Sequence, residues 1–178
     1  MFKKFLGVLL TVIFSFVPPS VFANNHAKTL QNLGDGEIMF AQGMIPHHEQ
    51  AIEMSNFALK NSSSKKIKKL AKSIISAQGK EIKQMKYWLA AANASAKMDH
   101  EMHMSGMLSS KELIALSKLS GSKFDQAFLR AMIQHHKGAI EMLNLLEGSK
   151  NSEVIKLRNS IKSSQSAEIA SMNAYLKK

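Results

Sequence analysis

Two short blocks of the sequence combine histidine and methionine at the same spacing. One reads MIPHHEQAIEM over residues 44–54, and the other reads MIQHHKGAIEM over residues 132–142. Neutral imidazole binds many transition metals and thioether sulfur is a soft ligand. Together they favour copper, with Cu(I) held by methionine and histidine and Cu(II) held mainly by histidine. The candidate metal ligands are Met44, His47, His48, Met54, Met132, His135, His136 and Met142.

The apolar residues around each block recur every three or four positions, which predicts a helix with the candidate ligands on one face. A second helix is expected after each block, over residues 65–89 and about 152–176. Each of these helices carries a glutamate, Glu81 or Glu168, at the centre of its apolar face, where a carboxylate needs a partner. We interpret these glutamates as acceptors for the second ring hydrogen of a ligand histidine, or else as direct metal ligands.

The similarity between the two halves extends beyond the two blocks. His135 lies 88 positions after His47, and Glu168 lies 87 positions after Glu81. A whole helical hairpin is therefore duplicated. Two antiparallel hairpins with apolar seams predict an all-α fold, a four-helix bundle, over residues 37–178. The sequence leaves open whether the repeats form two metal sites or share one.

The segment that connects the two hairpins, residues 93–108, is rich in methionine and histidine but has no helical or strand periodicity. We expect a crossover whose spare soft ligands capture copper and load the bundle, and a plain polar linker is the alternative. Ser109 and Glu112 then form a capping box, which predicts a short helix that ends by Gly121. The candidate loading residues are Met98, His100, Met102, His103, Met104 and Met107.

Residues 1–23 have the layout of a secretory signal peptide. Lys3 and Lys4 precede an apolar run over residues 5–17, and small residues up to Ala23 suit a cleavage site. The apolar run is too short for a comfortable membrane span. We therefore expect an exported protein, periplasmic or secreted, without a transmembrane span once the signal is removed. A flexible arm over residues 24–36 would then precede the bundle.

The chain has no cysteine, and its formal net charge of +11 falls to +9 without Lys3 and Lys4. An exported protein without disulfides is held by packing alone or by packing plus a ligand, and a copper site in an oxidising compartment gains from thioethers in place of thiols. A strongly positive charge can attract nucleic acid. Since the lysines are not interleaved with aromatic residues, we instead expect a solvated lysine surface near anionic envelope components, and no nucleic-acid partner.

Each candidate ligand also has an interpretation without metal. A methionine on a helix seam commonly fills a core, and a single histidine on an apolar face is commonly a hydrogen-bonded core residue. Adjacent histidines that are duplicated opposite a duplicated buried glutamate favour a functional site over packing alone. Glu53 and Glu141 also match between the repeats, but they fall at the edge of the polar face, so we expect them to be solvated.

Several of these motifs resemble those of the bacterial domain-of-unknown-function family 305. The similar features are the two Met-Ile-x-His-His blocks, Met104-Ser-Gly-Met107, Phe124-Asp125 and the Gln78-x-x-Glu81 segment, and the resemblance spans residues 37–176. It implies a ferritin-like helical bundle of exported proteins, some of which bind copper in the periplasm and are linked to copper resistance. It also implies a copper-binding role for the eight candidate ligands. Gly43 stands where many relatives have a further methionine, so the first block has one soft ligand fewer.

We therefore predict a non-enzymatic copper-binding protein that buffers, sequesters or transfers the ion, with other periplasmic copper proteins as partners. The alternative is a ferritin-like enzyme with iron in a di-iron carboxylate centre. Such centres use Glu-x-x-His motifs, whereas this chain offers Met44-x-x-His47 and Met132-x-x-His135, one hard ligand short in each repeat. A metal-free structural bundle of the cell envelope is a third interpretation.

Overall fold

The computed structural model describes residues 30, 32–97 and 104–177. No strand occurs within these ranges, which confirms the predicted all-α class. None of the helices there is long and apolar enough to span a membrane. The elements are α2 (Asp35–Asn61), α3 (Lys65–Ala91), α4 (Ser110–Ser117), α5 (Gly121–Met142), the 3-10 helix η1 (Leu143–Leu146) and α6 (Ser152–Leu176).

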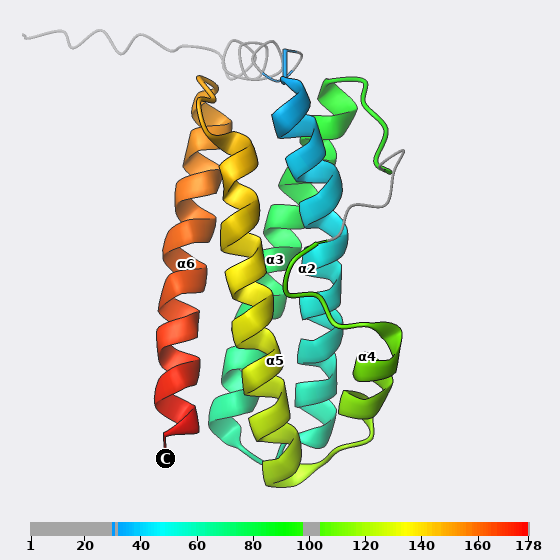
Figure 1. Ribbon diagram of the computed structural model, residues 1–178, viewed down its shortest axis with the longest axis vertical. Coiled ribbons are helices and arrows are strands. Elements are labelled where there is room, and N and C mark those ends of the chain that lie inside the picture. Colours follow the sequence, from blue (N-terminus) through cyan, green and yellow to red (C-terminus); the bar gives the residue numbers. More distant parts are fainter. Residues whose placement is uncertain (1–29, 31, 98–103, 178) are drawn as a thin grey trace, which may run out of the picture.

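The four long helices form a bundle of two antiparallel hairpins (Figure 1). α2 packs against α3 in the first hairpin, and α5 packs against α6 in the second. The hairpins meet mainly through α2 and α5, which also run antiparallel to each other. The two helices that carry the histidine blocks are therefore neighbours. The short helix α4 lies outside the bundle, against α2 and α5.

Polar side chains cap the starts of three helices. Ser64 and Asn151 each accept a hydrogen bond from a backbone amide in the first turn of α3 and α6, respectively. Ser109 and Glu112 form the predicted capping box at the start of α4. Caps of this kind satisfy amides that have no partner within the helix. The starts of these helices therefore agree closely with those expected from the sequence.

The flexible arm expected over residues 24–36 is shorter than predicted at its C-terminal end. α2 begins at Asp35, before the expected boundary, and Glu37 in its first turn accepts a hydrogen bond from the Ser149 hydroxyl. Leu30 is buried in the bundle core, with 1% of its surface exposed. Burial of an apolar side chain holds this part of the arm against the bundle. The earlier part of the arm and the expected signal peptide lie outside the described residues.

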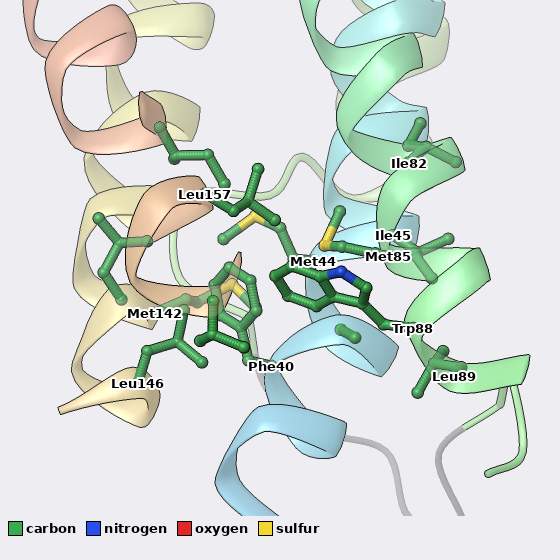
Figure 2. Packing of buried hydrophobic residues seen from close by; sticks show 14 of the residues in the cluster. Phe40, Met44, Ile45, Ile82, Met85, Trp88, Leu89, Met142, Leu146 and Leu157 are labelled. Carbon is green, nitrogen blue, oxygen red and sulfur yellow. The ribbon is translucent and has the colours of Figure 1, made fainter. Parts of the chain in front are cut away.

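The buried apolar residues form two clusters, one toward each end of the bundle. The first core contains Phe40 and Trp88 (Figure 2). The second core contains Phe124 and Phe128, whose stacked rings have centroids 5.7 Å apart. Between the two cores, every long helix contributes buried polar side chains. We call these residues the polar layer, and its members are His47, His48, Gln78, His135, His136 and Gln165.

Candidate metal centre

All four motif histidines are brought together in the polar layer, and none of their side chains is exposed. The rings of His47 on α2 and His135 on α5 lie side by side, with centroids 3.8 Å apart and planes tilted by 44°. His48 lies 6.5 Å from His47, and His136 lies 6.4 Å from His135, both measured between ring centroids. The antiparallel packing of α2 against α5 therefore joins the two repeats in one cluster.

The outer histidines, His48 and His136, each hydrogen-bond to a glutamate of the same hairpin. Nε2 of His48 lies 2.7 Å from Oε2 of Glu81, and Nε2 of His136 lies 2.7 Å from Oε2 of Glu168. Since an ionised carboxylate only accepts hydrogen bonds, each histidine donates from Nε2, and a neutral imidazole with its N–H at Nε2 has its lone pair on Nδ1. Carboxylates orient metal-binding imidazoles in this way. The contacts correspond to the first of the two roles that the sequence suggests for these glutamates.

The inner histidines, His47 and His135, have fewer partners. Nε2 of His47 donates to the Ser105 carbonyl over 3.2 Å. Among the described residues, neither ring nitrogen of His135 has a partner in hydrogen-bond geometry. Buried polar atoms without a partner are uncommon in folded proteins and call for an explanation such as an ion or a water molecule. The unpartnered ring nitrogens are Nδ1 of His47, Nδ1 of His48, both nitrogens of His135 and Nδ1 of His136.

Burial keeps the inner histidines neutral. It lowers the pKa of His47 from 6.5 to about 4, although the hydrogen bond to the Ser105 backbone raises this pKa while His48 and His136 lower it further. Burial is also the largest cause that holds the pKa of His135 well below its ordinary value. The charges of the other three histidines lower this pKa too, while the His47 backbone raises it. A neutral imidazole offers a lone pair, so protons compete little with a metal ion near neutral pH.

The four motif methionines lie in the two cores on either side of the polar layer. Met44 and Met142 belong to the first core, and Met54 and Met132 belong to the second. Because α2 and α5 run antiparallel, each core receives one motif methionine from each repeat. All four are buried, so they fill the core as well as supplying thioether sulfur to this part of the bundle.

Two further methionines occupy equivalent positions in the hairpins but were not among the candidate ligands. Met85 on α3 belongs to the first core and Met172 on α6 to the second, and neither is exposed. Figure 2 shows Met85 in the same cluster as Met44 and Met142. Each core thus contains three thioethers from three different helices. The signal in the sequence is that these two methionines match at the same 87-residue offset as the two glutamates.

Histidines and carboxylates alone do not complete a metal site here. Within the described ranges, no group of three or more histidine, aspartate or glutamate side chains is arranged to hold a metal ion. A metal ion would therefore also need a thioether, a carbonyl oxygen or a rotated imidazole. Glu81 and Glu168 are each engaged by a histidine of their own hairpin, an arrangement that gives no support to the di-iron carboxylate alternative.

Residues 104–108, which we call the strap, cross between α2 and α5 before α4 (Figure 1). The side-chain amide of Gln50 on α2 holds one end of the strap. It donates to the Leu108 carbonyl over 2.9 Å and accepts from the Leu108 amide over 2.7 Å. Ser105 supplies the carbonyl that accepts from His47. The strap therefore lies over the inner histidine pair, and its Ser105 carbonyl accepts a hydrogen bond from Nε2 of His47.

Two glycines make room for the strap against α5. Gly106 has a φ of +81°, in a region that favours glycine, and a Cβ there would lie 2.3 Å from the Gln134 carbonyl oxygen. A Cβ on Gly138 would lie 1.8 Å from the Ser105 carbonyl oxygen. Gln50 and Gly138 occupy equivalent positions in the two blocks. The two repeats therefore differ at this position: Gln50 of the first binds the strap, and Gly138 of the second leaves space for it.

The candidate loading residues fall partly inside and partly outside the described chain. Met104 packs against the first core, and Met107 is half-buried in the strap. The expectation that these two residues belong to a mobile span is not supported, because the strap is anchored on both α2 and α5. The loading residues that lie outside the described residues are Met98, His100, Met102 and His103.

Comparison with known proteins identifies the family. A family model described as "Domain of unknown function (DUF305)" matches residues 37–176. The chain belongs to the DUF305 family. Among solved structures, a DUF305 protein from Streptomyces coelicolor is 26% identical with a TM-score of 0.76, and the match covers 80% of this chain and 92% of that one. A DUF305 fragment from Deinococcus radiodurans is 30% identical with a TM-score of 0.75, covering 81% and 97%.

The DUF305 chain is also similar to a protein whose structures contain metal. CopM in its Cu(II)-bound form is 35% identical with a TM-score of 0.70, and the match covers 79% of this chain and 95% of that one. CopM has also been solved in Cu(I)-bound and Ag-bound forms. A comparison with functionally curated proteins found no match. These similarities confirm the family and the helical fold that the motifs predict.

Proposed function

We propose that this protein binds copper in its polar layer and acts as a non-enzymatic buffer, store or carrier of the ion. The observation that carries the proposal is the cluster of four buried histidines from both repeats, with five ring nitrogens that have no partner among the described residues. Imidazole binds both copper oxidation states, and thioether sulfur favours Cu(I). The copper- and silver-bound forms of CopM support this choice of metal.

In this proposal the two repeats share one centre. His47 and His135 lie closest together and would supply the central nitrogens. His48 and His136 would bind through Nδ1 after a small rotation, because Glu81 and Glu168 hold their Nε2 atoms. Cu(II) would be held mainly by the imidazoles. Cu(I) would in addition draw on motif methionines, whose flexible side chains can turn out of the adjoining cores.

Copper loading would proceed past the strap. The Ser105 carbonyl occupies Nε2 of His47, so an ion that binds this nitrogen must first displace the hydrogen bond. Met104 and Met107 lie in the same segment and would offer thioethers at the entry to the polar layer. We propose that the preceding methionines and histidines, over residues 98–103, capture the ion before this step.

The compartment proposed for this function is the periplasm or the exterior of the cell, reached through the signal peptide expected over residues 1–23. The absence of cysteine suits an oxidising environment, where thioethers and imidazoles bind copper without forming disulfides. Other copper proteins of the same compartment would deliver or receive the ion, since a buffer or carrier exchanges its cargo.

Copper titration of matched variants tests the proposed centre. Replacement of His47, His48, His135 and His136 by glutamine should lower copper affinity at least a hundredfold, because every imidazole of the centre is lost, while circular dichroism remains helical. The control replaces the three other histidines of the chain, His26, His100 and His103. It should keep the tight site even if it binds fewer ions in total. If the four-histidine variant still binds copper tightly, these histidines are packing residues and not ligands.

Metal analysis of protein purified without chelator separates the proposed function from its alternatives. Copper in the wild-type protein, and its loss from the four-histidine variant, would support the copper centre. Iron in place of copper would favour the ferritin-like enzyme. Protein that contains neither metal and binds neither on titration would favour a structural bundle of the cell envelope.

A further inference from the structure

The outer side of α3 is rich in exposed lysines over most of its length. Seven of its eight lysines are exposed, and Lys68 is half-buried. The central row follows positions 65, 69, 72, 76, 80, 83 and 87, in steps of three and four, which places it along one side of the helix. Ser76 and Tyr87 complete this row, and Tyr87 is 51% exposed. The lysine face consists of Lys65, Lys66, Lys68, Lys69, Lys72, Lys80, Lys83 and Lys86.

The duplication provides an internal comparison that separates this face from the needs of the fold. α3 contains eight lysines and one glutamate, a net charge of +7. Its counterpart α6 contains two lysines, one arginine and two glutamates, a net charge of +1, and exposes mainly serine, alanine and asparagine. Both helices pack in the same kind of hairpin, and each provides a glutamate that accepts a hydrogen bond from a histidine of the other helix in its hairpin. The lysine face is therefore required neither by the hairpin nor by the polar layer.

Few acidic side chains neutralise the lysine face. Within the described residues, Lys86 is the one lysine of α3 in an ion pair, with Glu49 of α2 at 3.0 Å between exposed side chains. The single carboxylate of α3 itself, Glu81, turns inward to His48. Like charges along one helix repel each other and weaken it. Anions outside the chain can reduce this repulsion, because the ion pair within the protein involves Lys86 alone among the described lysines of α3.

We propose that the lysine face of α3 docks the protein on an anionic phospholipid surface. A helix of 27 residues presents its charges over about 40 Å, an extended row that suits a planar array of phosphates. The charges are all lysines, which act as flexible point charges, whereas specific recognition of one carboxylate or phosphate favours the planar fork of arginine. Tyr87, exposed in the same row, is a residue type that sits well at the lipid headgroup level.

This orientation leaves the copper-loading side of the molecule accessible. In Figure 1, α3 lies behind α2, whereas the strap lies in front of α2, beside α5. A protein that rests on a membrane through α3 therefore directs the strap and α4 away from the lipid. Docking would keep the protein close to the membrane without covering the route into the polar layer.

Vesicle co-sedimentation tests the docking proposal with the protein purified after export, so that all variants share the same N-terminal processing. The probes are vesicles of phosphatidylcholine alone and vesicles that contain about one third phosphatidylglycerol. Wild-type protein should bind the anionic vesicles, and high salt should release it, because a lysine near such a surface strengthens binding about fivefold. The face variant replaces Lys65, Lys69, Lys72, Lys80 and Lys83 with glutamine and should bind at least tenfold more weakly.

A charge-matched control separates the face from net charge. It replaces five exposed lysines elsewhere, and should keep most of the vesicle binding. Equal losses in both variants, or wild-type binding to neutral vesicles as strong as to anionic ones, would overturn the proposal. Binding to a soluble polyanion such as heparin, without binding to anionic vesicles, would also overturn the proposal. The control lysines are Lys111, Lys118, Lys123, Lys150 and Lys162.

Discussion

His47 and His135 are neutral because they are buried, and this has a consequence for folding. Their rings lie together in the polar layer, where a positive charge would be poorly solvated and would face another imidazole at short range. The same burial that makes them available to a metal ion therefore makes the metal-free fold sensitive to acid.

The metal-free protein should lose stability as the pH falls from about 6.5 to about 4. Folded His47 has its pKa lowered from 6.5 to about 4, so the unfolded chain binds more protons between these values. This contribution is fully present above pH 6.5 and declines through the window. For His47 alone it is on the order of 3 kcal/mol. Urea unfolding at a series of pH values measures the effect.

The control for acid sensitivity is the variant with His47→Gln and His135→Gln. Its free energy of unfolding should depend less steeply on pH across the same window, because the two buried imidazoles that resist protonation are gone. An identical pH dependence in the variant and the wild type would assign the acid sensitivity to other groups.

The carboxylates of Glu81 and Glu168 should affect copper affinity by orienting the outer histidines, without binding copper themselves. Glu81→Gln or Glu168→Gln removes the charge that fixes Nε2 of the histidine, and each should weaken copper binding about 10- to 100-fold. The matched control is Glu53→Gln with Glu141→Gln, a repeat-equivalent pair that is exposed in the structure. Competition titration against a copper chelator compares them, and equal affinities in all variants would contradict the orienting role.

At the scale of elements, the strap explains why two duplicated blocks are not identical. Gln50 clamps Leu108 from α2, while Gly138 at the equivalent position of α5 leaves space for the Ser105 carbonyl. A single strap crosses between the two helices, so the two sides of its seat need different residues. Sequence divergence at this position therefore follows from packing.

Gly138→Ala should unseat the strap. Its new Cβ would lie 1.8 Å from the Ser105 carbonyl oxygen, so the variant should lose roughly 1–3 kcal/mol of stability and show faster hydrogen exchange over residues 104–108. Gly79→Ala is the control, since a Cβ at this position in α3 meets nothing within 4 Å. It should stabilise the protein by up to about 1 kcal/mol through helix propensity. Equal effects of the two changes on stability would contradict the close contact.

The proposed capture segment can be tested without disturbing the strap. Because the strap is anchored by Gln50 and His47, its deletion would alter the fold as well as any loading step. Replacing Met98 and Met102 with leucine, and His100 and His103 with glutamine, keeps the length of the chain. This variant should bind fewer copper ions or transfer them more slowly, with an unchanged melting temperature. Equal stoichiometry and transfer rate would make the segment a linker.

At the scale of the whole molecule, the bundle is two apolar cores joined through a polar layer. The layer contains imidazoles and also the side chains of Gln78 and Gln165, whose amide atoms have no hydrogen-bond partner among the described residues. Buried polar groups without partners reduce stability. An ion bound in the layer would stabilise both halves at once, because the layer receives side chains from all four long helices.

Copper should therefore raise the melting temperature of the whole bundle in a single transition. A ligand present at a hundred times its dissociation constant stabilises the folded state by about 2.7 kcal/mol, which is a shift of several degrees for a domain of this size. Calorimetry with and without copper measures the shift, and the four-histidine variant should show none. A shift of equal size in that variant would place the stabilising ion elsewhere.

The sequence alone determined the helices and the family of this protein. Periodicity and capping residues such as Ser109 placed the helices, because both depend on residues only a few positions apart. The repeated His-His blocks and the matched Glu81 and Glu168 indicated a duplicated hairpin and its family. Each of these features is local, or is a comparison of one stretch of sequence with another.

Only the tertiary structure decided how the repeats meet. Whether His47 lies beside His135, which methionines share a core and where the strap crosses all depend on how the apolar faces of four helices pack. That packing depends on contacts between residues far apart in the sequence. The same pattern of helices is compatible with several placements of the helices relative to one another. The difference between Gln50 and Gly138 was visible in the sequence, but its cause, a strap held on one helix and admitted by the other, exists only in three dimensions.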